Sequence, residues 1–445
     1  MKRIAVVGSG FVGLSIAVFF ASKGYRVLVS DKDKEKVSLT RKGKTPFFEP
    51  ELEQVLKKSL EKGTLRPVIG GGEAVSETDV IFVTVGTPSL SDGSANLSFV
   101  KKAAEEIGKA MKEKEDHKLI VVKSTVPPGT TENIVRPILE KHSGKKAGNG
   151  FGLTMSPEFL REGSSLFDVS NPDRIVIGEF DKQSGDSFEE LNRQAFQNNV
   201  PILRMSLAEA ELAKYASNCF LAAKVSFINE MANICERIPG VDIVQVAKAM
   251  GLDPRIGKEF LKAGTGWGGS CFPKDTKALV SIAKSLGYRS RLVKDVVAVN
   301  AMQARRMVEI AEEELGDLKM KNVAVLGLSF KPDTDDIREA PSLRIIELLL
   351  GKGARVTAFD PVATENARRV LGNRIKYAEG VSECLRNADC CMLVTEWSIF
   401  KKLRPEDFTA PMRRPLLIDG RRIFDPIVFS KKLELRAIGL NKCAR

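Results

Sequence analysis

The stretch Ile4-Ala-Val-Val-Gly8-Ser-Gly10-Phe-Val-Gly13 decides the fold of the first part of the chain. An apolar strand, Ile4–Val7, runs into a G-x-G-x-x-G turn, and an apolar helix follows. A second apolar strand, Tyr25–Ser30, ends at Asp31. An acidic residue about 20 positions after such a turn binds the ribose of a dinucleotide. The series of strand, glycine turn, helix, strand and acid therefore predicts a dinucleotide-binding domain.

The same stretch indicates which dinucleotide binds. Glycines permit the tight turn and let the backbone approach the pyrophosphate, which sits at the helix N-terminus. Asp31 would accept hydrogen bonds from ribose hydroxyls and repel a 2′-phosphate, which favours NAD over NADP. Lys32 and Lys34 follow at once and leave NADP as an open alternative.

Further apolar strands are expected along the first part of the chain. They are Val80–Val85, Leu119–Val122, Gly152–Met155 and Arg174–Gly178. The first three run into polar loops, and ligands of open α/β sheets bind at the carboxyl ends of strands. We therefore expect cofactor or substrate to meet four loop residues, Thr87, Thr125, Glu158 and Glu162. The alternative, that they only form turns, stays open.

A long helix is predicted from Ser206 to about Arg237, because this range contains neither Pro nor Gly. Ser206 and Glu209 form a capping box at its start. Lys214 and Asn218 lie one turn apart on one face, either as a functional pair or as part of a solvated surface. We expect the helix to join two halves of the molecule. It would pair with another subunit through an apolar stripe of Leu221, Val225 and Ile228.

The stretch Gly264-Thr-Gly-Trp-Gly-Gly-Ser-Cys-Phe-Pro-Lys-Asp275 carries the candidate chemistry. Four glycines precede Cys271, and glycine lets a backbone approach a ligand closely. Lys274 and Asp275 follow the cysteine. A nearby cation favours the thiolate, which is the nucleophilic form of cysteine. The alternative is a glycine-rich turn with a buried structural cysteine. Helices are expected around this stretch, at Val241–Met250, Thr276–Leu286 and Val293–Leu315.

The last part of the chain repeats the first pattern without its G-x-G-x-x-G. A strand at Lys321–Leu326 meets a glycine turn, and a helix at Ser342–Leu350 leads to a strand at Arg355–Phe359 that ends at Asp360. Two more strands follow, Ala388–Thr395 and Leu416–Asp419. Three cations lie at strand ends and suit the phosphates of a nucleotide: Lys331, Arg338 and Arg421.

These elements predict an α/β protein with two Rossmann-like doubly wound domains, joined by the long helix and a helical linker domain. We expect an NAD-binding domain over residues 1–200. A central helical and dimerisation domain with the cysteine loop would cover residues 201–318. A second Rossmann-like domain, whose strand-end cations suit the phosphates of a nucleotide, would cover residues 319–445.

Composition narrows the class of protein. The 445 residues are 43% hydrophobic, and 69 Lys and Arg against 57 Asp and Glu give a net charge of +12. The surplus suits an anionic substrate or reflects solvated surface lysines, whereas no basic run interleaved with aromatics predicts a nucleic-acid partner. Seven scattered cysteines and two histidines predict reduced thiols in a cytoplasmic protein and no metal site. We expect neither a signal peptide nor a membrane span.

The motifs, taken in order, resemble the UDP-glucose/GDP-mannose dehydrogenase family of nucleotide-sugar 6-dehydrogenases. The residues that carry the resemblance are Gly8-Ser-Gly-Phe-Val-Gly13, Val85-Gly-Thr-Pro88, Ser124-Thr-Val-Pro127, Pro157-Glu-Phe-Leu-Arg-Glu-Gly163, Pro172-Asp-Arg-Ile-Val-Ile-Gly178, Lys214-Tyr-x-x-Asn218, Arg255-Ile-Gly257, Gly268-Gly-Ser-Cys-Phe-Pro-Lys-Asp275, Phe330-Lys-Pro-Asp-Thr-Asp-Asp-Ile-Arg338 and Asp419-Gly-Arg421. Departures are Asn96, Ser156, Ala263 and Trp267, none of which removes a reacting group.

The resemblance implies roles for individual residues. Cys271 would be the nucleophile, with five residues around the reacting carbon: Lys214, Asn218, Asp275, Glu158 and Thr125. NAD would meet Gly8, Gly10, Phe11, Val12, Gly13, Asp31, Lys36, Thr87, Thr125, Glu162, Lys274 and Arg338. The UDP-sugar would meet Glu158, Phe159, Leu160, Arg161, Lys214, Asn218, Arg255, Phe260, Gly264, Gly268, Phe272, Phe330, Lys331 and Arg421. Arg255 would come from the neighbouring subunit of a homodimer.

The implied reaction is a four-electron oxidation of a sugar C6 alcohol to a carboxylate, with UDP-glucose as the expected substrate and two NAD reduced. Lys214 and Asn218 would stabilise an oxyanion, and Asp275, Thr125 and Glu158 are the candidate bases. GDP-mannose or an N-acetylated UDP-hexosamine is the alternative substrate. A catalytically idle dinucleotide-binding regulator is the alternative of another class, but the presence of Cys271, Lys214 and Asp275 argues against it.

Overall fold

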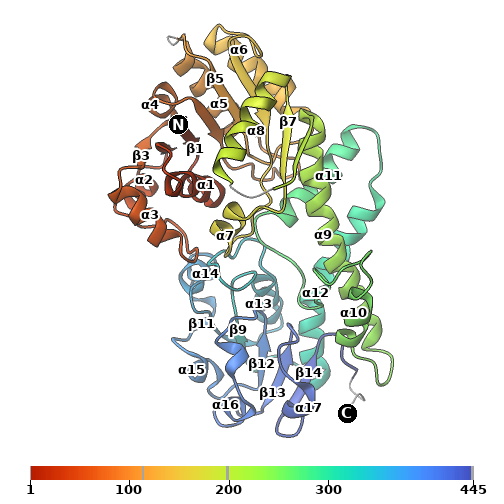
Figure 1. The fold of residues 1–445 in the computed structure, drawn as a ribbon. Helices are drawn as coiled ribbons and strands as arrows, with labels where there is room; N and C mark the ends of the chain where they lie inside the picture. The colour runs from red at the N-terminus through yellow and green to blue at the C-terminus, as the bar shows by residue number, and fades with distance from the viewer. Residues whose placement is uncertain (1, 113–114, 197–199, 442–445) are drawn as a thin grey trace. The chain divides into compact units, whose positions relative to one another are not determined.

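The computed structural model describes residues 2–112, 115–196 and 200–441, so Cys443 lies outside the described residues. The chain divides into two compact units (Figure 1). The first unit comprises the chain up to Ser217 together with Lys277–Leu286. The second unit comprises Asn218–Thr276 and the chain from Gly287 onward.

The first unit is built on an eight-stranded sheet with the order β3-β2-β1-β4-β5-β6-β7-β8. All neighbours are parallel except β6 and β7. The strands are β1 Ile4–Val7, β2 Val27–Asp31, β3 Leu65–Ile69, β4 Val80–Val83, β5 Lys118–Val122, β6 Phe151–Met155, β7 Ile175–Glu179 and β8 Ile202–Ser206. The parallel strands give adjacent carboxyl ends, where the expected polar loops begin.

Both faces of the sheet are buried along β1, β2, β4, β5 and β7, because alternate residues of these strands enter different apolar cores. Ile4 and Val6 of β1 pack into one core, and Ala5 and Val7 pack into another. Such burial explains why the strands are almost continuously apolar. The helices of this unit are α1 Phe11–Ser22, α2 Lys34–Arg41, α3 Leu52–Glu61, α4 Gly71–Ser76, α5 Ser98–Met111, η1 Thr131–Val135, α6 Arg136–Ser143, α7 Ser165–Ser170 and α8 Lys182–Ala195.

The long helix is confirmed as α9, Leu207–Cys235. Its capping box forms as expected, since Ser206 donates through N and Oγ to Glu209 and Glu209 N donates back to Ser206 Oγ. The helices that follow are α10 Ile243–Gly251, α11 Phe272–Ser285 and α12 Arg291–Leu315. Helix α11 begins at Phe272, four residues before the expected start, so Lys274 and Asp275 lie in its first turn.

The apolar stripe expected on α9 needs a correction. Ile228 is fully buried in the core of the second unit, so it forms no exposed contact surface. The exposed apolar residues of the same helix segment are Phe220, Phe227 and Ile234, which are 68%, 46% and 46% exposed. Their spacing of seven residues places them on one helix face.

The second unit contains a six-stranded parallel sheet with the order β11-β10-β9-β12-β13-β14. Its strands are β9 Asn322–Leu326, β10 Arg355–Phe359, β11 Lys376–Tyr377, β12 Cys390–Leu393, β13 Leu416–Asp419 and β14 Glu434–Ala437. This order repeats that of β1 to β6, so the fold class with two Rossmann-like domains is confirmed. Its helices are α13 Pro341–Gly351, α14 Thr364–Leu371, η2 Gly372–Arg374, α15 Val381–Leu385, η3 Phe400–Lys402, α16 Pro405–Thr409 and α17 Pro426–Phe429. Among the described residues, every helix is too short or too polar to span a membrane.

Candidate active site

The glycine turn after β1 leaves room for a ligand at the N-terminus of α1. Gly8 has φ +106°, a conformation that other residues rarely adopt. A Cβ atom on Gly13 would lie 1.8 Å from the carbonyl oxygen of Gly8, so only glycine fits there. No atom lies within 4 Å of a Cβ built on Gly10. Phe11 stacks on Phe47 with 3.9 Å between ring centroids. The turn therefore presents backbone amides that can hold a pyrophosphate.

Asp31 is held at the end of β2 beside this turn. Its Oδ2 accepts hydrogen bonds from Ser9 N and Ser9 Oγ, both at 2.9 Å, and its Oδ1 accepts from Asp33 N at 3.0 Å. Burial opposes ionisation, but these hydrogen bonds and the charge of Lys36 lower the pKa of the carboxyl overall. Asp31 stays partly exposed, so an ionised acceptor remains for ribose hydroxyls. The turn and this acid fit NAD.

Lys32 does not lie free beside Asp31. Its Nζ stands 4.3 Å from the centroid of the Phe99 ring, a cation–π contact. The loops that follow β4 and β5 are tied together, since Thr87 Oγ1 donates to Thr125 O at 2.8 Å. Ser124 Oγ donates to Val85 O at 2.7 Å. The structure therefore brings Thr87 and Thr125 together at the carboxyl ends of β4 and β5.

Glu158 and Lys214 form the central ion pair of the first unit. Lys214 Nζ lies 3.2 Å from Glu158 Oε1, and their side chains are only 3% and 9% exposed. Glu158 Oε2 also accepts a hydrogen bond from Leu160 N at 2.6 Å. The ring of Phe159 lies beneath two cations, with Arg174 at 3.9 Å and Lys214 at 5.2 Å from its centroid. The loop after β6 thus meets α9 through a buried charge.

Sequence reasoning missed one member of this cluster, Lys123. Its Nζ donates to Ser156 Oγ at 3.3 Å, and Ser156 is buried. Burial lowers the pKa of Lys123 to about 8, an effect that Glu158 opposes and Lys214 reinforces. Lys123 directly follows β5, so the strand-end rule that selected Thr125 could have found it.

The remaining residues of the loop after β6 make local contacts. Arg161 binds Asp168 through N, Nε and Nη2, with the closest ion-pair distance 2.6 Å. Gly163 N, next to Glu162, donates to the buried Glu49 at 2.8 Å, and Ser165 N donates to it at 2.7 Å. Glu49 therefore anchors this loop, although no sequence motif indicated it.

Cys271 lies in the second unit, immediately before α11. It is partly exposed, whereas the other described cysteines are buried. Burial raises the pKa of Cys219 and Cys384 to about 12, which keeps both as unreactive thiols. Ser270 Oγ lies 3.4 Å from Cys271 Sγ. The N-terminal amides of α11 favour negative charge at this position.

Asp275 organises the polar contacts in the first turn of α11. It is 1% exposed, and its Oδ2 accepts a hydrogen bond from Asn218 Nδ2 at 2.6 Å. Its Oδ1 forms an ion pair with Lys274 Nζ. Asn218 lies one turn after Lys214 on α9. The structure thus brings Asn218, Asp275 and Lys274 together within the second unit.

The glycine loop packs closely on the second sheet's domain. A Cβ on Gly268 would lie 2.3 Å from Glu339 O, so a side chain cannot be accommodated there. Gly269 N donates to Arg338 O at 2.9 Å, and a Cβ on Gly269 would lie 2.7 Å from the Phe330 ring. Arg338 itself binds Asp336, with Nη2 at 2.7 Å from Oδ2, and remains 57% exposed.

Arg421 lies beside Gly264, at the start of this loop. A Cβ on Gly264 would lie 2.6 Å from Gly420 O and 3.5 Å from Arg421 Cδ. Arg421 Nε donates to Val394 O at 2.6 Å, and Nη2 donates to Phe330 O at 3.4 Å. Phe330, Gly264, Gly268 and Arg421 are therefore gathered within one unit. Lys331 Nζ adds a cation 5.7 Å from the Phe330 ring centroid.

Two of the residues predicted to bind substrate, Phe260 and Arg255, make contacts other than those within this group. Phe260 has φ 63° and its ring centroid lies 6.2 Å from that of Phe272. Arg255 binds Asp253 at 2.6 Å, and its side chain is 88% exposed. Nothing inside its own unit buries Arg255 among the described residues.

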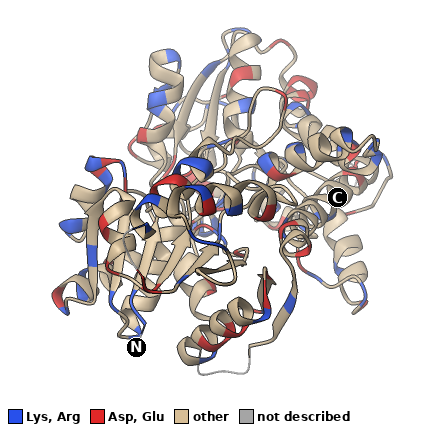
Figure 2. Cartoon of the chain, turned by 90° about the horizontal axis from the view of Figure 1, so that it is seen from above, with Lys and Arg blue, Asp and Glu red and all other residues tan. Residues whose placement is uncertain are grey.

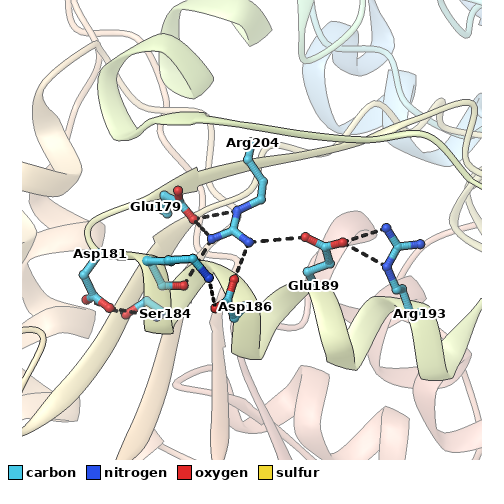
Figure 3. Close-up of polar contacts among 8 residues, drawn as sticks. Glu179, Asp181, Ser184, Asp186, Glu189, Arg193 and Arg204 are labelled. Carbon is cyan, nitrogen blue, oxygen red and sulfur yellow. Dashed lines mark hydrogen bonds and ion pairs between the residues drawn. The ribbon is translucent and has the colours of Figure 1, made fainter.

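A second charged cluster lies in the first unit, around Arg204 of β8 (Figure 3). Arg204 Nε donates to Glu179 Oε2 at 2.8 Å, and its Nη1 lies 3.4 Å from Glu189 Oε2. It also pairs with Asp186, while Arg193 pairs with Glu189. These contacts hold β8 against β7 and α8, so we interpret the cluster as structural. Figure 2 shows Lys and Arg as well as Asp and Glu distributed over many helices and loops of the chain.

Comparison with known proteins places this geometry in one family. Three profiles of the UDP-glucose/GDP-mannose dehydrogenase family match in order: its NAD binding domain at residues 2–196, its central domain at 208–302 and its UDP binding domain at 324–426. The UDP-glucose 6-dehydrogenase YwqF of Bacillus subtilis is 42% identical over 422 residues, covering 95% of this chain and 94% of that protein. The UDP-glucose 6-dehydrogenase AglM of Haloferax volcanii is 42% identical over 423 residues, covering 95% and 97%.

Solved structures agree. A UDP-glucose dehydrogenase from the hyperthermophilic archaeon Pyrobaculum islandicum superposes with a TM-score of 0.91 at 40% identity, covering 99% of this chain and 98% of that chain. A UDP-D-ManNAc dehydrogenase from Pyrococcus horikoshii gives a TM-score of 0.86 at 27% identity, with coverage of 98% and 99%. The resemblance drawn from the sequence motifs is confirmed.

Proposed function

Because this chain belongs to the UDP-glucose/GDP-mannose dehydrogenase family, we propose that it oxidises the C6 alcohol of UDP-glucose to a carboxylate. It is an NAD-dependent oxidoreductase, and bound NAD supplies the acceptor for each hydride that leaves the sugar. The reaction consumes one UDP-glucose, two NAD⁺ and one water, and it yields UDP-glucuronate, two NADH and three protons. Relatives named as UDP-glucose 6-dehydrogenases support this substrate over GDP-mannose or an N-acetylated UDP-hexosamine.

The observation that carries the proposal is the partly exposed thiol of Cys271 at the start of α11. Oxidation of an alcohol to an aldehyde needs no thiol. A thiol is needed if the aldehyde is to be oxidised again, because its addition to the aldehyde gives a thiohemiacetal with a second hydride to lose. Loss of that hydride gives a thioester, and water releases the acid and restores the thiol.

The other site residues take roles around this thiol. Lys214 and Asn218 donate to the oxyanion that forms at C6, since a cation and an amide are both hydrogen-bond donors. Asp275, Thr125 and Glu158 are the candidates for accepting the hydroxyl proton, directly or through water. The carboxylate of Asp31 binds the ribose of NAD, and the turn at Gly8–Gly13 holds its pyrophosphate. Glu162, Lys274 and Arg338 are proposed to meet the cofactor as well.

The three segments of the chain divide this work. Residues 1–200 bind NAD, residues 201–318 carry the cysteine loop and the dimer contact, and residues 319–445 bind UDP. Phe330, Lys331 and Arg421 serve the nucleotide, together with the loop that includes Phe260, Gly264, Gly268 and Phe272. Phe159, Leu160 and Arg161 complete the proposed sugar contacts.

The proposed assembly is a cytoplasmic homodimer. Phe220, Phe227 and Ile234 form an exposed apolar face on α9, and a second copy would bury it. Arg255 is 88% exposed and would complete the substrate site of the partner subunit. Reduced thiols suit the cytoplasm.

A turnover assay with a panel of nucleotide sugars tests the function. UDP-glucose, GDP-mannose and UDP-N-acetylmannosamine are each incubated with NAD⁺, and NADH and the acid product are measured. We expect UDP-glucose to give the highest kcat/KM and two NADH per sugar consumed. One NADH per sugar, or preference for another sugar, would overturn the proposal.

A further inference from the structure

Lys123 gives the buried cluster of the first unit a second cation. Lys214 and Glu158 lie 3.2 Å apart with side chains 3% and 9% exposed. A buried pair of opposite charges nearly cancels its own field, so on its own it would stabilise a new negative charge only weakly. Lys123 changes the sum, because two ammonium groups and one carboxylate carry a net charge of +1 when all three are ionised.

The position of Lys123 is fixed by its neighbours. It directly follows β5, and its Nζ donates to Ser156 Oγ at 3.3 Å. Ser156 lies two residues before Glu158 in the loop after β6 and is buried. The charged groups that act on Lys123 are Glu158 from that loop and Lys214 from α9. Three elements therefore hold the cluster together.

We propose that Lys123 is a positioning residue of the oxidation: as a second cation beside Glu158, it leaves the charge of Lys214 available to the oxyanion at C6. This inference rests on the proposed function, since the oxyanion belongs to that reaction. Lys123 acts through Glu158 and Lys214 and needs no contact with the substrate. The net positive charge of the cluster is neutralised only when the oxyanion forms. A preorganised site of this kind stabilises the transition state more than the ground state.

The protonation of Lys123 supports this arrangement. Burial lowers the pKa of Lys123 to about 8, so the Lys123 side chain is only partly protonated near that pH. A negative charge at the site stabilises the ammonium form of Lys123 and so favours its protonation. The ammonium is the active form, so the contribution of Lys123 is present below about pH 8 and is lost as pH rises through its pKa.

The test compares Lys123→Met and Lys123→Arg with wild type, using pH profiles of kcat and KM. Lys123→Met should lower kcat by about tenfold or more because one fixed cation is lost, with KM changed by less than about threefold. The pH profile of kcat for Lys123→Met should lack the decrease near pH 8 that wild type shows. Lys123→Arg should restore much of kcat and move that fall to higher pH, because a guanidinium stays protonated.

Lys118→Met is the matched control. Lys118 is a fully buried lysine at the start of β5, the strand that Lys123 follows, and it binds Asp116 at 2.8 Å and Thr78 O at 2.5 Å. Its loss should reduce stability and leave the shape of the pH profile unchanged. A Lys123→Met profile that follows wild type, as the control does, would overturn the inference.

Proton uptake gives a second measurement that needs no turnover. Calorimetry of UDP-glucuronate binding near pH 8.5, in two buffers of different ionisation heat, should show a proton taken up by wild type and less by Lys123→Met. If that variant fails to fold, Lys123→Arg should likewise take up less, because it is already protonated. Equal uptake in wild type and Lys123→Arg would refute the inference. Failure of wild type to oxidise UDP-glucose would instead refute the proposed function.

Discussion

Replacement of Asn218 by alanine separates structural from catalytic contributions at the proposed site. Asn218 Nδ2 donates to Asp275 Oδ2 at 2.6 Å, and the two residues are 6% and 1% exposed. An amide nitrogen carries two hydrogens, so one serves Asp275 and the other can serve the oxyanion at C6. Asn218→Ala removes both donors at once.

Two magnitudes follow from this geometry. The buried carboxylate loses a charge-assisted hydrogen bond, which should lower the free energy of unfolding by about 1.5–3 kcal/mol. Loss of one donor to an oxyanion typically costs about 100- to 1,000-fold in kcat. Urea denaturation measures the first quantity, and NADH formation at saturating UDP-glucose and NAD⁺ measures the second.

Asn192→Ala is the matched control. Asn192 is also a buried helical amide, and its Nδ2 donates to Phe188 O at 2.7 Å within α8. Its loss should reduce stability but leave kcat within about twofold, because it belongs to no proposed site. If Asn218→Ala kept a kcat within about threefold of wild type, the assignment of Asn218 to the oxyanion would be wrong.

Three further predictions test other parts of the proposal. Cys271→Ala should form no UDP-glucuronate, and Cys271→Ser should stall at a slowly hydrolysed ester; chromatography of the acid product checks both, and a fully active Cys271→Ala would contradict the mechanism. Asp31→Ala should lower kcat/KM for NAD by about 10- to 150-fold, because charge-assisted hydrogen bonds worth about 1.5–3 kcal/mol are lost. The ratio of kcat/KM for NAD to that for NADP should fall as well. Arg255→Ala and Cys271→Ala should each be inactive alone. Mixed subunits of the two should regain about a quarter of wild-type activity, since half of the dimers are mixed and each has one intact site; no recovery on mixing would place Arg255 in its own subunit's site.

Much of the fold could be predicted because local sequence carries it. The strand Ile4–Val7 and its glycine turn match β1 and the start of α1, since apolar runs and glycines act over a few residues. Strand β3 was not predicted, because Pro67 interrupts the pattern. Proline is tolerated there because β3 is an edge strand of the sheet. The antiparallel pairing of β6 with β7 also has no local signal.

The candidate site shows the same limit. Residue types and spacing selected Lys214 and Asn218, which are neighbours on one helix. The hydrogen bond between Asn218 and Asp275 joins residues far apart in the sequence, and no spacing rule predicts it. Lys123 was missed because a lysine at a strand end looks like a solvated residue until its neighbours, Ser156 and Glu158, are known.

Two equivalent acids explain why only one of the two domains is expected to bind NAD. Asp31 ends β2 and Asp360 follows β10, and each accepts hydrogen bonds from the backbone and hydroxyl of a serine, Ser9 or Ser329. Asp360 also accepts from Trp397 Nε1 at 3.0 Å and from Leu328 N at 2.7 Å.

These extra donors change what the second acid can do. Asp360 Oδ1 takes two more hydrogen bonds, from Val362 N at 3.0 Å and Ala363 N at 2.8 Å. Asp360 is 2% exposed, and donors of the chain itself occupy its acceptor positions. Asp31 remains partly exposed. In the proposed NAD site a ribose hydroxyl would bind Asp31, whereas at Asp360 it would have to displace a tryptophan. The repeated topology thus carries a cofactor site in one copy and a structural anchor in the other.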